Sequence, residues 1–140
     1  MGSIPTQLEV EVYIHATESV DKVINSLIDL LTTNAPIIIE VLYGHYGNPI
    51  YKVSSVIKDE ELAMKIITRL CSSMTNRNQL METISARVDS GGNIFIRLDK
   101  QEFAQGHVVL SDGDDVVRIK VKVGGDNNGQ VSPLLGGSGF

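Results

Sequence analysis

The stretch Leu8-Glu9-Val10-Glu11-Val12-Tyr13-Ile14-His15 decides the fold, because apolar and polar residues alternate along it without a break. A period of two is typical of a β-strand with one buried face and one open face. The even-numbered aliphatic residues are expected to point into the core, so Tyr13 and His15 should point away from it. A strand of this kind predicts an α+β domain whose helices cover only one side of the sheet.

Two further segments have helical spacing of their apolar residues. The first spans residues 19–32, with Thr17 or Ser19 able to cap it and Pro36 placed to end it. The second spans residues 59–74 and opens with acidic residues, which are favourable in a first helical turn. Both helices are expected to pack on the sheet face that the first strand buries.

The rest of the chain predicts short strands, turns and one short helix. β-branched and alternating residues predict strands at Ile37–Tyr43, Ile50–Ile57, Ile84–Val88, Ile94–Leu98, Val108–Leu110 and Val116–Val123. The Gly-rich sequence between the third and fourth of these predicts a hairpin. Leu80–Glu82 is interpreted as one more helical turn, and Lys100–Gln105 as a short helix that ends at Gly106.

These elements predict one α+β domain over residues 1–123, with a mostly antiparallel sheet and two main helices on one face. Residues 124–140 lack apolar periodicity and are rich in Gly, Asn and Ser, so they predict a flexible tail. No apolar signal segment and no long uncharged apolar run is present, which predicts a cytoplasmic protein without a membrane partner. The single Cys71 excludes an internal disulfide and a cysteine-based zinc site.

The charge balance is acidic but uneven. The net charge is −5, which by itself argues against a protein that binds nucleic acid only through phosphate neutralisation. Residues 1–49 hold one base and six acids, whereas residues 50–123 hold 11 bases and 10 acids. An anionic partner would therefore meet the second half of the chain.

Some side chains of the turn Tyr43-Gly44-His45-Tyr46-Gly47-Asn48-Pro49 are not needed to form a turn. Gly and Pro suffice for a tight connection, whereas His45, Tyr46 and Asn48 are groups that stack on or hydrogen-bond a ligand. We predict that His45 or Tyr46 is accessible. The alternative is that Tyr46 folds back onto the sheet and His45 satisfies a backbone carbonyl.

The open sheet face offers a second set of candidates. Alternation places Tyr13 and His15 there from the first strand, Phe95 and Arg97 from the hairpin, and Arg118, Lys120 and Lys122 from the last strand. Aromatic residues interleaved with bases are typical of an RNA-stacking surface. An ordinary solvated face, with Glu9 and Glu11 paired to these bases across the strands, is the other interpretation.

Four stretches together resemble an archaeal protein family described as RNA-binding or predicted to be exosome-associated. They are His15-Ala16-Thr17-Glu18, Gly44-His45-Tyr46-Gly47-Asn48-Pro49-Ile50, Ile96-Arg97-Leu98-Asp99-Lys100-Gln101 and Asp114-Asp115-Val116-Val117-Arg118-Ile119-Lys120-Val121. The resemblance implies a fold like that of ribosomal protein L5, and the family offers no established catalytic residues to carry over. No cofactor is predicted. Glu102-Phe103 departs from the aromatic and aliphatic pair expected after Gln101, and places an extra acid there.

The sequence therefore predicts a non-enzymatic protein associated with RNA or ribonucleoprotein and working with RNA-processing machinery such as the exosome. Arg97, Lys100, Arg118 and Lys120 are expected to contact phosphates. Tyr13, His15, His45, Tyr46 and Phe95 are expected to stack on or read bases, with Asn48 beside them. No metal site is predicted. A protein-interaction module or homodimeric adaptor that does not touch RNA is the alternative.

Overall fold

A computed structural model of the 140-residue chain describes residues 4–32 and 35–124. Its helices are α1 (Val20–Leu31), α2 (Glu60–Ser73), α3 (Arg77–Thr83), the 3-10 helix η1 (Ile84–Arg87) and α4 (Lys100–Ala104). Its strands are β1 (Ile4–His15), β2 (Ile38–Tyr43), β3 (Pro49–Ile57), β4 (Ile94–Asp99) and β5 (Val116–Gly124). Apart from Gly124, the predicted tail lies outside the described residues.

The strands form one antiparallel sheet in the order β2-β3-β1-β5-β4, with the long β1 in the centre. The alternating stretch that predicted β1 sets its two faces. Val10 is 2% exposed and its partner strand's Val121 is fully buried, whereas Glu9 and Glu11 lie on the opposite side. The predicted α+β sheet is confirmed.

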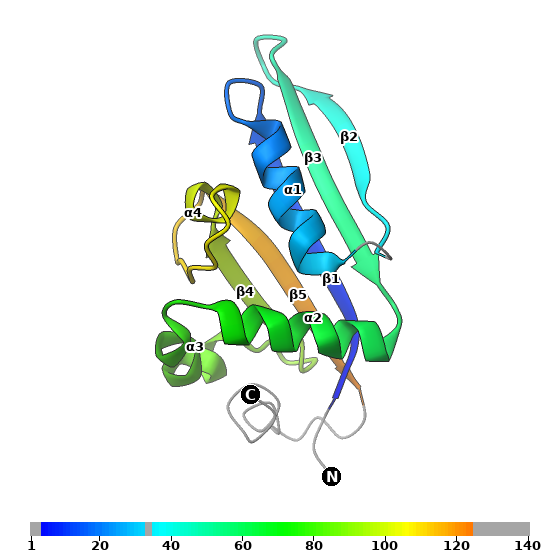
Figure 1. The fold of residues 1–140 in the computed structure, drawn as a ribbon, viewed down its shortest axis with the longest axis vertical. Coiled ribbons are helices and arrows are strands. Elements are labelled where there is room, and N and C mark those ends of the chain that lie inside the picture. The colour runs from blue at the N-terminus through cyan, green and yellow to red at the C-terminus, as the bar shows by residue number, and fades with distance from the viewer. Residues whose placement is uncertain (1–3, 33–34, 125–140) are drawn as a thin grey trace.

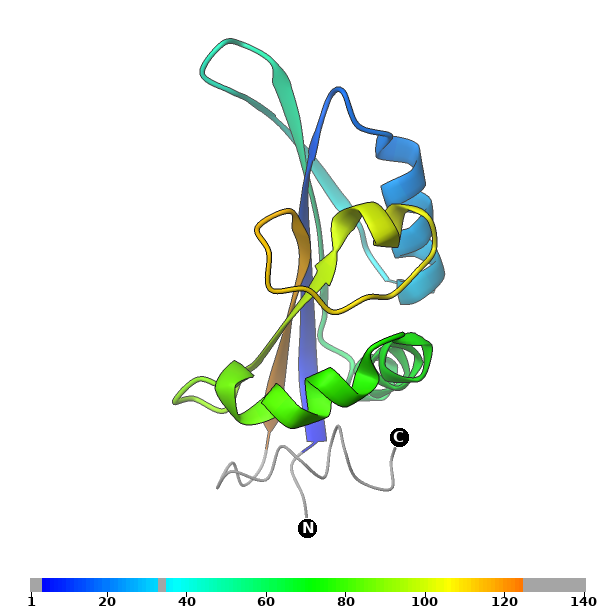
Figure 2. The same ribbon diagram turned by 90° about the vertical axis from the view of Figure 1, so that its left-hand side faces the viewer.

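Both main helices lie on the same side of the sheet, as Figure 1 and, edge-on, Figure 2 show. The apolar stripe of α1 buries Val23 and Leu27, and that of α2 buries Ile66 and Ile67. Asp59 caps α2 by accepting a hydrogen bond from the backbone N–H of Glu61 at 3.0 Å. One hydrophobic core joins these helices to the inner face of the sheet, so the other face is left open.

Two predicted strands are wrong. Ile84–Val88 does not form the first arm of a hairpin, because α3 continues directly into η1 and only Val88 bridges to Ile94. The alternating residues of this segment do not share one buried face, since Ile84 is buried but Ala86 is exposed. Val108–Leu110 makes only isolated bridges, to Met74 and Leu98.

The predicted short helices are confirmed as α3 and α4. Asp99 caps α4 through the N–H of Glu102, and Gly106 follows it with φ +87°, a conformation that glycine adopts without strain. Around the open face, the 88–93 loop, the 110–115 loop and the tip of the β2–β3 hairpin all project to the side away from α1 and α2 (Figure 2). These segments form a rim around that face.

Candidate nucleic-acid interface

Strand register arranges the open face into rows that run across the sheet. One row reads Phe95, Lys120, Glu9 and Val56, and the next reads Arg97, Arg118, Glu11 and Ser54. The following row begins at Tyr13, opposite Lys52. Residues from four strands therefore meet on a surface that none of the described helices covers (Figure 2).

The β4–β5 side of this face carries the basic and aromatic residues. Phe95 is 42% exposed, and the Lys120 Nζ lies 5.8 Å from the centroid of its ring, within cation–π range. Arg97 and Arg118 are direct neighbours on adjacent strands. Like charges directly opposite each other destabilise a sheet, and an anion bound between them would relieve that repulsion.

The acidic residues on this face neutralise its bases only in part. Glu9 pairs with Lys122 at 3.6 Å, and Glu11 pairs with Lys52 at 3.9 Å. The expected cross-strand partners of these acids, Lys120 and Arg118, are adjacent in register but form no ion pair within the described part of the chain. Two bases thus stay available on β5.

Arg97 is held from the rim of the face. Its guanidinium lies 3.9 Å from Asp112 Oδ1 and donates to the Gly113 carbonyl at 3.2 Å. Asp112 is shared with Arg87, which reaches the same oxygen at 3.1 Å. The 110–115 loop therefore fixes where the Arg97 side chain lies beside Arg118.

A shallow groove of about 350 Å³ crosses the face. Its charged lining residues are three bases and two acids, namely Lys52, Arg118, Lys120, Glu9 and Glu11. Phe95, Val56 and Ser54 are among its uncharged lining residues. This groove has apolar surface between its bases. It therefore suits a ligand that is both flat and anionic better than a ligand that is only charged.

Lys100 does not belong to this surface, contrary to the prediction. Its side chain is 3% exposed and lies among acceptors: Glu18 Oε1 at 2.8 Å, Asp115 Oδ1 at 2.6 Å and the Tyr13 carbonyl at 2.9 Å. These three acceptors use the whole donor capacity of an ammonium group. Lys100 therefore joins the end of β1, the start of α1 and the start of β5, and cannot reach a phosphate without breaking that junction.

The protonation of this buried cluster follows from its contacts. Burial acts to lower the pKa of Lys100, but the hydrogen bonds to Asp115 and Glu18 outweigh it and the pKa is raised. Burial likewise acts to raise the pKa of Glu18 and of Asp115, yet their bonds with Lys100 leave both lowered. All three groups are therefore charged at neutral pH.

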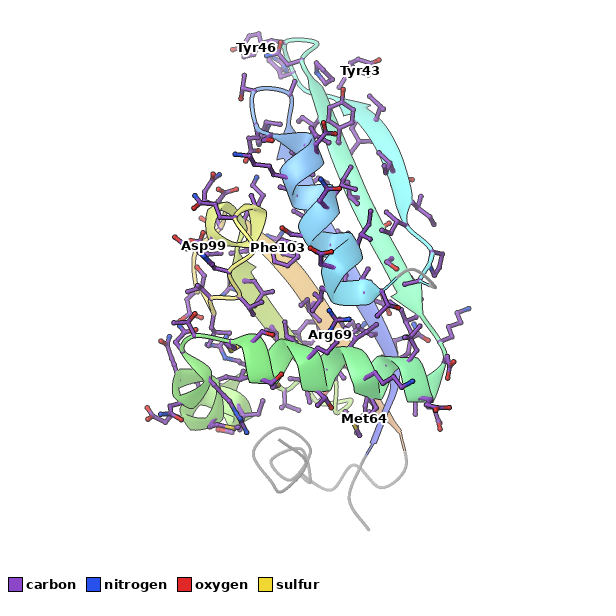
Figure 3. All side chains as sticks on the ribbon, in the orientation of Figure 1. Tyr43, Tyr46, Met64, Arg69, Asp99 and Phe103 are labelled. Atoms are coloured by element: carbon purple, nitrogen blue, oxygen red, sulfur yellow. The ribbon has the colours of Figure 1, made fainter. Side chains whose placement is uncertain are left out.

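The hairpin tip is exposed, as predicted. Tyr46 is 87% exposed, and its ring meets that of His45 edge-on at 4.9 Å between centroids. Tyr46 and Tyr43 stand at the end of the molecule furthest from α2 in Figure 3. Asn48 is also exposed, while its carbonyl accepts the Gly44 N–H at 2.8 Å and closes the turn.

The structure thus gathers some of the predicted residues and separates others. Phe95, Arg97, Arg118 and Lys120 form one cluster. Tyr13 is half-buried and His15 exposed, further along β1. The six residue steps from Glu9 to His15 cover roughly 20 Å at about 3.4 Å per step, so the hairpin tip lies apart from this cluster.

Three residues of the face were missed from the sequence. Lys52, Ser54 and Val56 line the groove, and the alternation of Val53, Ser55 and Ile57 with them carries the signal. Ser55 interrupts the apolar set at an inward position, where its hydroxyl donates to the Pro36 carbonyl. Because of this one polar residue, the inward-facing positions of β3 are not uniformly apolar in the sequence.

Within residues 4–32 and 35–124, no group of three or more His, Cys, Asp or Glu side chains is placed to hold a metal ion. None of the helices in that part of the chain is long and apolar enough to span a membrane.

The fold and the site define a class: a small α+β protein with helices on one side of an antiparallel sheet and, on the other, an open surface that presents bases, acids and an exposed aromatic ring. A family model described as "RNA binding" matches residues 7–123, and the chain belongs to this RNA-binding family.

Similar proteins come from archaea. RNA-binding protein PAB1135 of Pyrococcus abyssi is 33% identical over 123 residues, which cover 83% of this chain and 80% of that protein. The crystal structure of AF2318 from Archaeoglobus fulgidus, of the family DUF54, is 25% identical with a TM-score of 0.71, covering 84% of this chain and 86% of that one. SSO0741 from Sulfolobus solfataricus, of the same family, is 23% identical with a TM-score of 0.75 over 92% and 93%.

Proposed function

We propose that this protein binds RNA through the open face of its sheet and catalyses no reaction on it. The observation that carries the proposal is the cross-strand pair Arg97–Arg118 beside the row Phe95–Lys120. Two adjacent guanidinium groups favour a phosphate, and an exposed ring next to them favours a base. Membership of an RNA-binding family and the name of the Pyrococcus abyssi relative support the same ligand.

Single-stranded RNA suits this surface best. Unstacked bases can lie flat on an exposed aromatic side chain, whereas the paired bases of a double helix cannot. Among the described residues, Phe95 supplies the one ring that lines the groove, so the cluster would hold about one base and its flanking phosphates. Tyr13, His15 and the hairpin tip with His45, Tyr46 and Asn48 lie along the path by which a longer strand would continue.

The test compares two double variants of equal net charge. Arg118→Gln with Lys120→Gln removes two bases from the face, and Lys58→Gln with Lys65→Gln removes two exposed bases at and just before α2. Binding of a labelled single-stranded RNA is titrated at two salt concentrations by fluorescence anisotropy. A plot of log K against log salt has a negative slope. Loss of two phosphate contacts should make this slope shallower by about 1.4, at roughly 0.7 per neutralised phosphate.

Phe95→Ala should weaken binding by about 1–3 kcal/mol at either salt concentration, the usual effect of losing one stacked base. The α2-side double variant should bind like wild type. Wild-type protein that fails to bind at low salt, or two double variants that lose affinity equally, would refute the open-face site.

The cellular setting is a further part of the proposal. Action with the RNA-processing exosome in the cytoplasm, and the likeness to ribosomal protein L5, stay predictions from the sequence. A reconstituted archaeal exosome tests the first of these: the protein should change the rate of RNA degradation, and Arg118→Gln with Lys120→Gln should abolish that change.

One observation favours the alternative of a protein-interaction module or homodimeric adaptor. All six residues of β2 are exposed, although five of them are apolar or aromatic. RNA binding at the β4–β5 side of the open face does not use this strand.

A further inference from the structure

The two edge strands of the sheet differ in whether other parts of the chain cover their outer side. At the β4 edge, the backbone N–H of Asp99 donates to Val109 at 2.8 Å and that of Ser111 donates to Arg97 at 2.9 Å, so the chain covers this strand's outer side. At the other edge, β2 pairs with β3 and with no other strand of the described chain. The described residues that follow β4 thus protect one edge and leave the other open.

β2 also lacks the features by which soluble proteins block an open edge. Such edges carry lysines, prolines, bulges or inward charges. Residues 38–43 contain no lysine or proline, and their register with β3 runs without a bulge. Glu40 supplies the strand's one charge, and Lys52 lies 3.8 Å from its carboxylate.

Both faces of β2 expose apolar side chains. Ile38 and Leu42 lie on the open face, 56% and 42% exposed. Ile39, Val41 and Tyr43 point to the helix side, yet they are 49%, 50% and 72% exposed. The reason is visible in Figure 1, where β2 lies beyond β3 and outside the cover of α1.

We propose that a second copy of this chain covers the edge, with two β2 strands pairing antiparallel about a two-fold axis. This inference goes beyond RNA binding and does not depend on it. The strand fits itself because nearly all its exposed groups are aliphatic or aromatic, and because an isologous contact needs only one such patch on each copy. A charged peptide partner would find only Glu40 to recognise, already held by Lys52.

The outer side of β2 has backbone hydrogen-bonding groups that such a pairing would use. Hydrogen bonds alternate along an antiparallel pair, and Gly44 N–H donates to Asn48 across the turn at 2.8 Å. The even-numbered residues of β2 therefore bond to β3, which leaves the N–H and C=O groups of Ile39, Val41 and Tyr43 directed outward. These three residues supply the free ladder that a second β2 would complete.

Charge selects the register. If the axis passed beside Glu40, the two Glu40 carboxylates would lie directly opposite each other, which is unfavourable. An axis beside Val41 instead sets Val41 against its own copy, Ile39 against Tyr43, and Glu40 against Leu42. Aromatic–β-branched pairs such as Ile39–Tyr43 are among the favourable cross-strand contacts. We therefore assign the register centred on Val41.

The pairing would be reversible. Covering five side chains would bury on the order of 500 Å² on each copy, at the small end of specific interfaces, below about 1,200 Å² in total. A two-fold axis perpendicular to the sheet places both sets of helices on one side. The two open faces then lie side by side in a ten-stranded sheet.

The experiment is sedimentation equilibrium of the full chain over about 5 µM to 1 mM, without RNA. Wild type should shift from monomer to dimer within this range. Val41→Lys, which sets two ammonium groups against each other at the axis, should stay monomeric. Ile28→Lys changes an apolar residue of α1 that is 38% exposed, and should dimerise like wild type. Circular dichroism checks that each variant is folded.

Cysteine cross-linking then tests the register. Val41→Cys should form a disulfide-linked dimer on mild oxidation, while Ile39→Cys should cross-link only when mixed with Tyr43→Cys. The native Cys71 is buried and does not compete. Wild type that stays monomeric at 1 mM, a dimer that survives Val41→Lys, or efficient self-linking of Ile39→Cys would overturn the proposal.

Discussion

Replacing Lys100 by Met should destabilise the fold although it removes no apolar contact. Methionine keeps the aliphatic stem, so the change isolates the ammonium group that Glu18, Asp115 and the Tyr13 carbonyl surround at 2.6–2.9 Å. Removing one partner of a fully buried ion pair costs about 3–5 kcal/mol. Here the carboxylates are 21% and 56% exposed and water can reach them, so we expect about 2–3 kcal/mol.

The loss should depend on pH in a defined direction. The pKa values of Glu18 and Asp115 are lowered in the folded protein, so these groups stabilise it above their ordinary pKa near 4 and lose that effect as pH falls through the lowered values. The pKa of Lys100 is raised, so its contribution persists below about 10.4 and is lost only in strong alkali. The gap between wild type and Lys100→Met should stay constant from about pH 6 to 9 and shrink below pH 4.

Urea unfolding followed by circular dichroism at pH 7 and at pH 3 measures this difference. The midpoint should fall by roughly 1 M at pH 7, given a slope of about 1–3 kcal/mol per M. Lys65→Met, which removes an exposed lysine from α2, is the control and should change stability by less than about 0.5 kcal/mol. An equal loss at both pH values, or a loss at pH 7 no larger than the control's, would refute the role given to this cluster.

Two further predictions concern the core and its boundary with the open face. Burial raises the pKa of the Cys71 thiol to about 11, so an aromatic disulfide reagent at pH 8 should modify it only after urea unfolds the chain; rapid modification of the native protein would contradict its burial. Ile96→Ala should cost about 2–5 kcal/mol because Ile96 is fully buried, whereas Phe95→Ala, one residue away on the open face, should cost less than half as much. Thermal unfolding of the two variants decides this, and similar losses would mean that the faces of β4 are misassigned.

The sequence predicted most of the framework because the framework follows from local spacing. Alternation in Leu8–Ile14 fixed which side of β1 is buried, and helical spacing placed both main helices within about a residue of α1 and α2. The same alternation put Phe95, Arg97, Arg118 and Lys120 on one face, where the structure has them. A period of two in a strand, or of 3.6 in a helix, determines which residues share a side. Burial of the apolar side then places the element in the core.

The tertiary structure alone decided which charges meet and which strand stays uncovered. Nothing local distinguishes Lys100 from Lys120, yet one lies buried between two carboxylates from distant segments and the other lies over a ring on the surface. Likewise, the apolar run at Ile37–Leu42 predicts a strand but not its exposure, which arises because α1 lies over the middle of the sheet and does not reach its edge (Figure 1). Pairing and cover depend on contacts between segments far apart in the chain, and those are set only when the layers have packed.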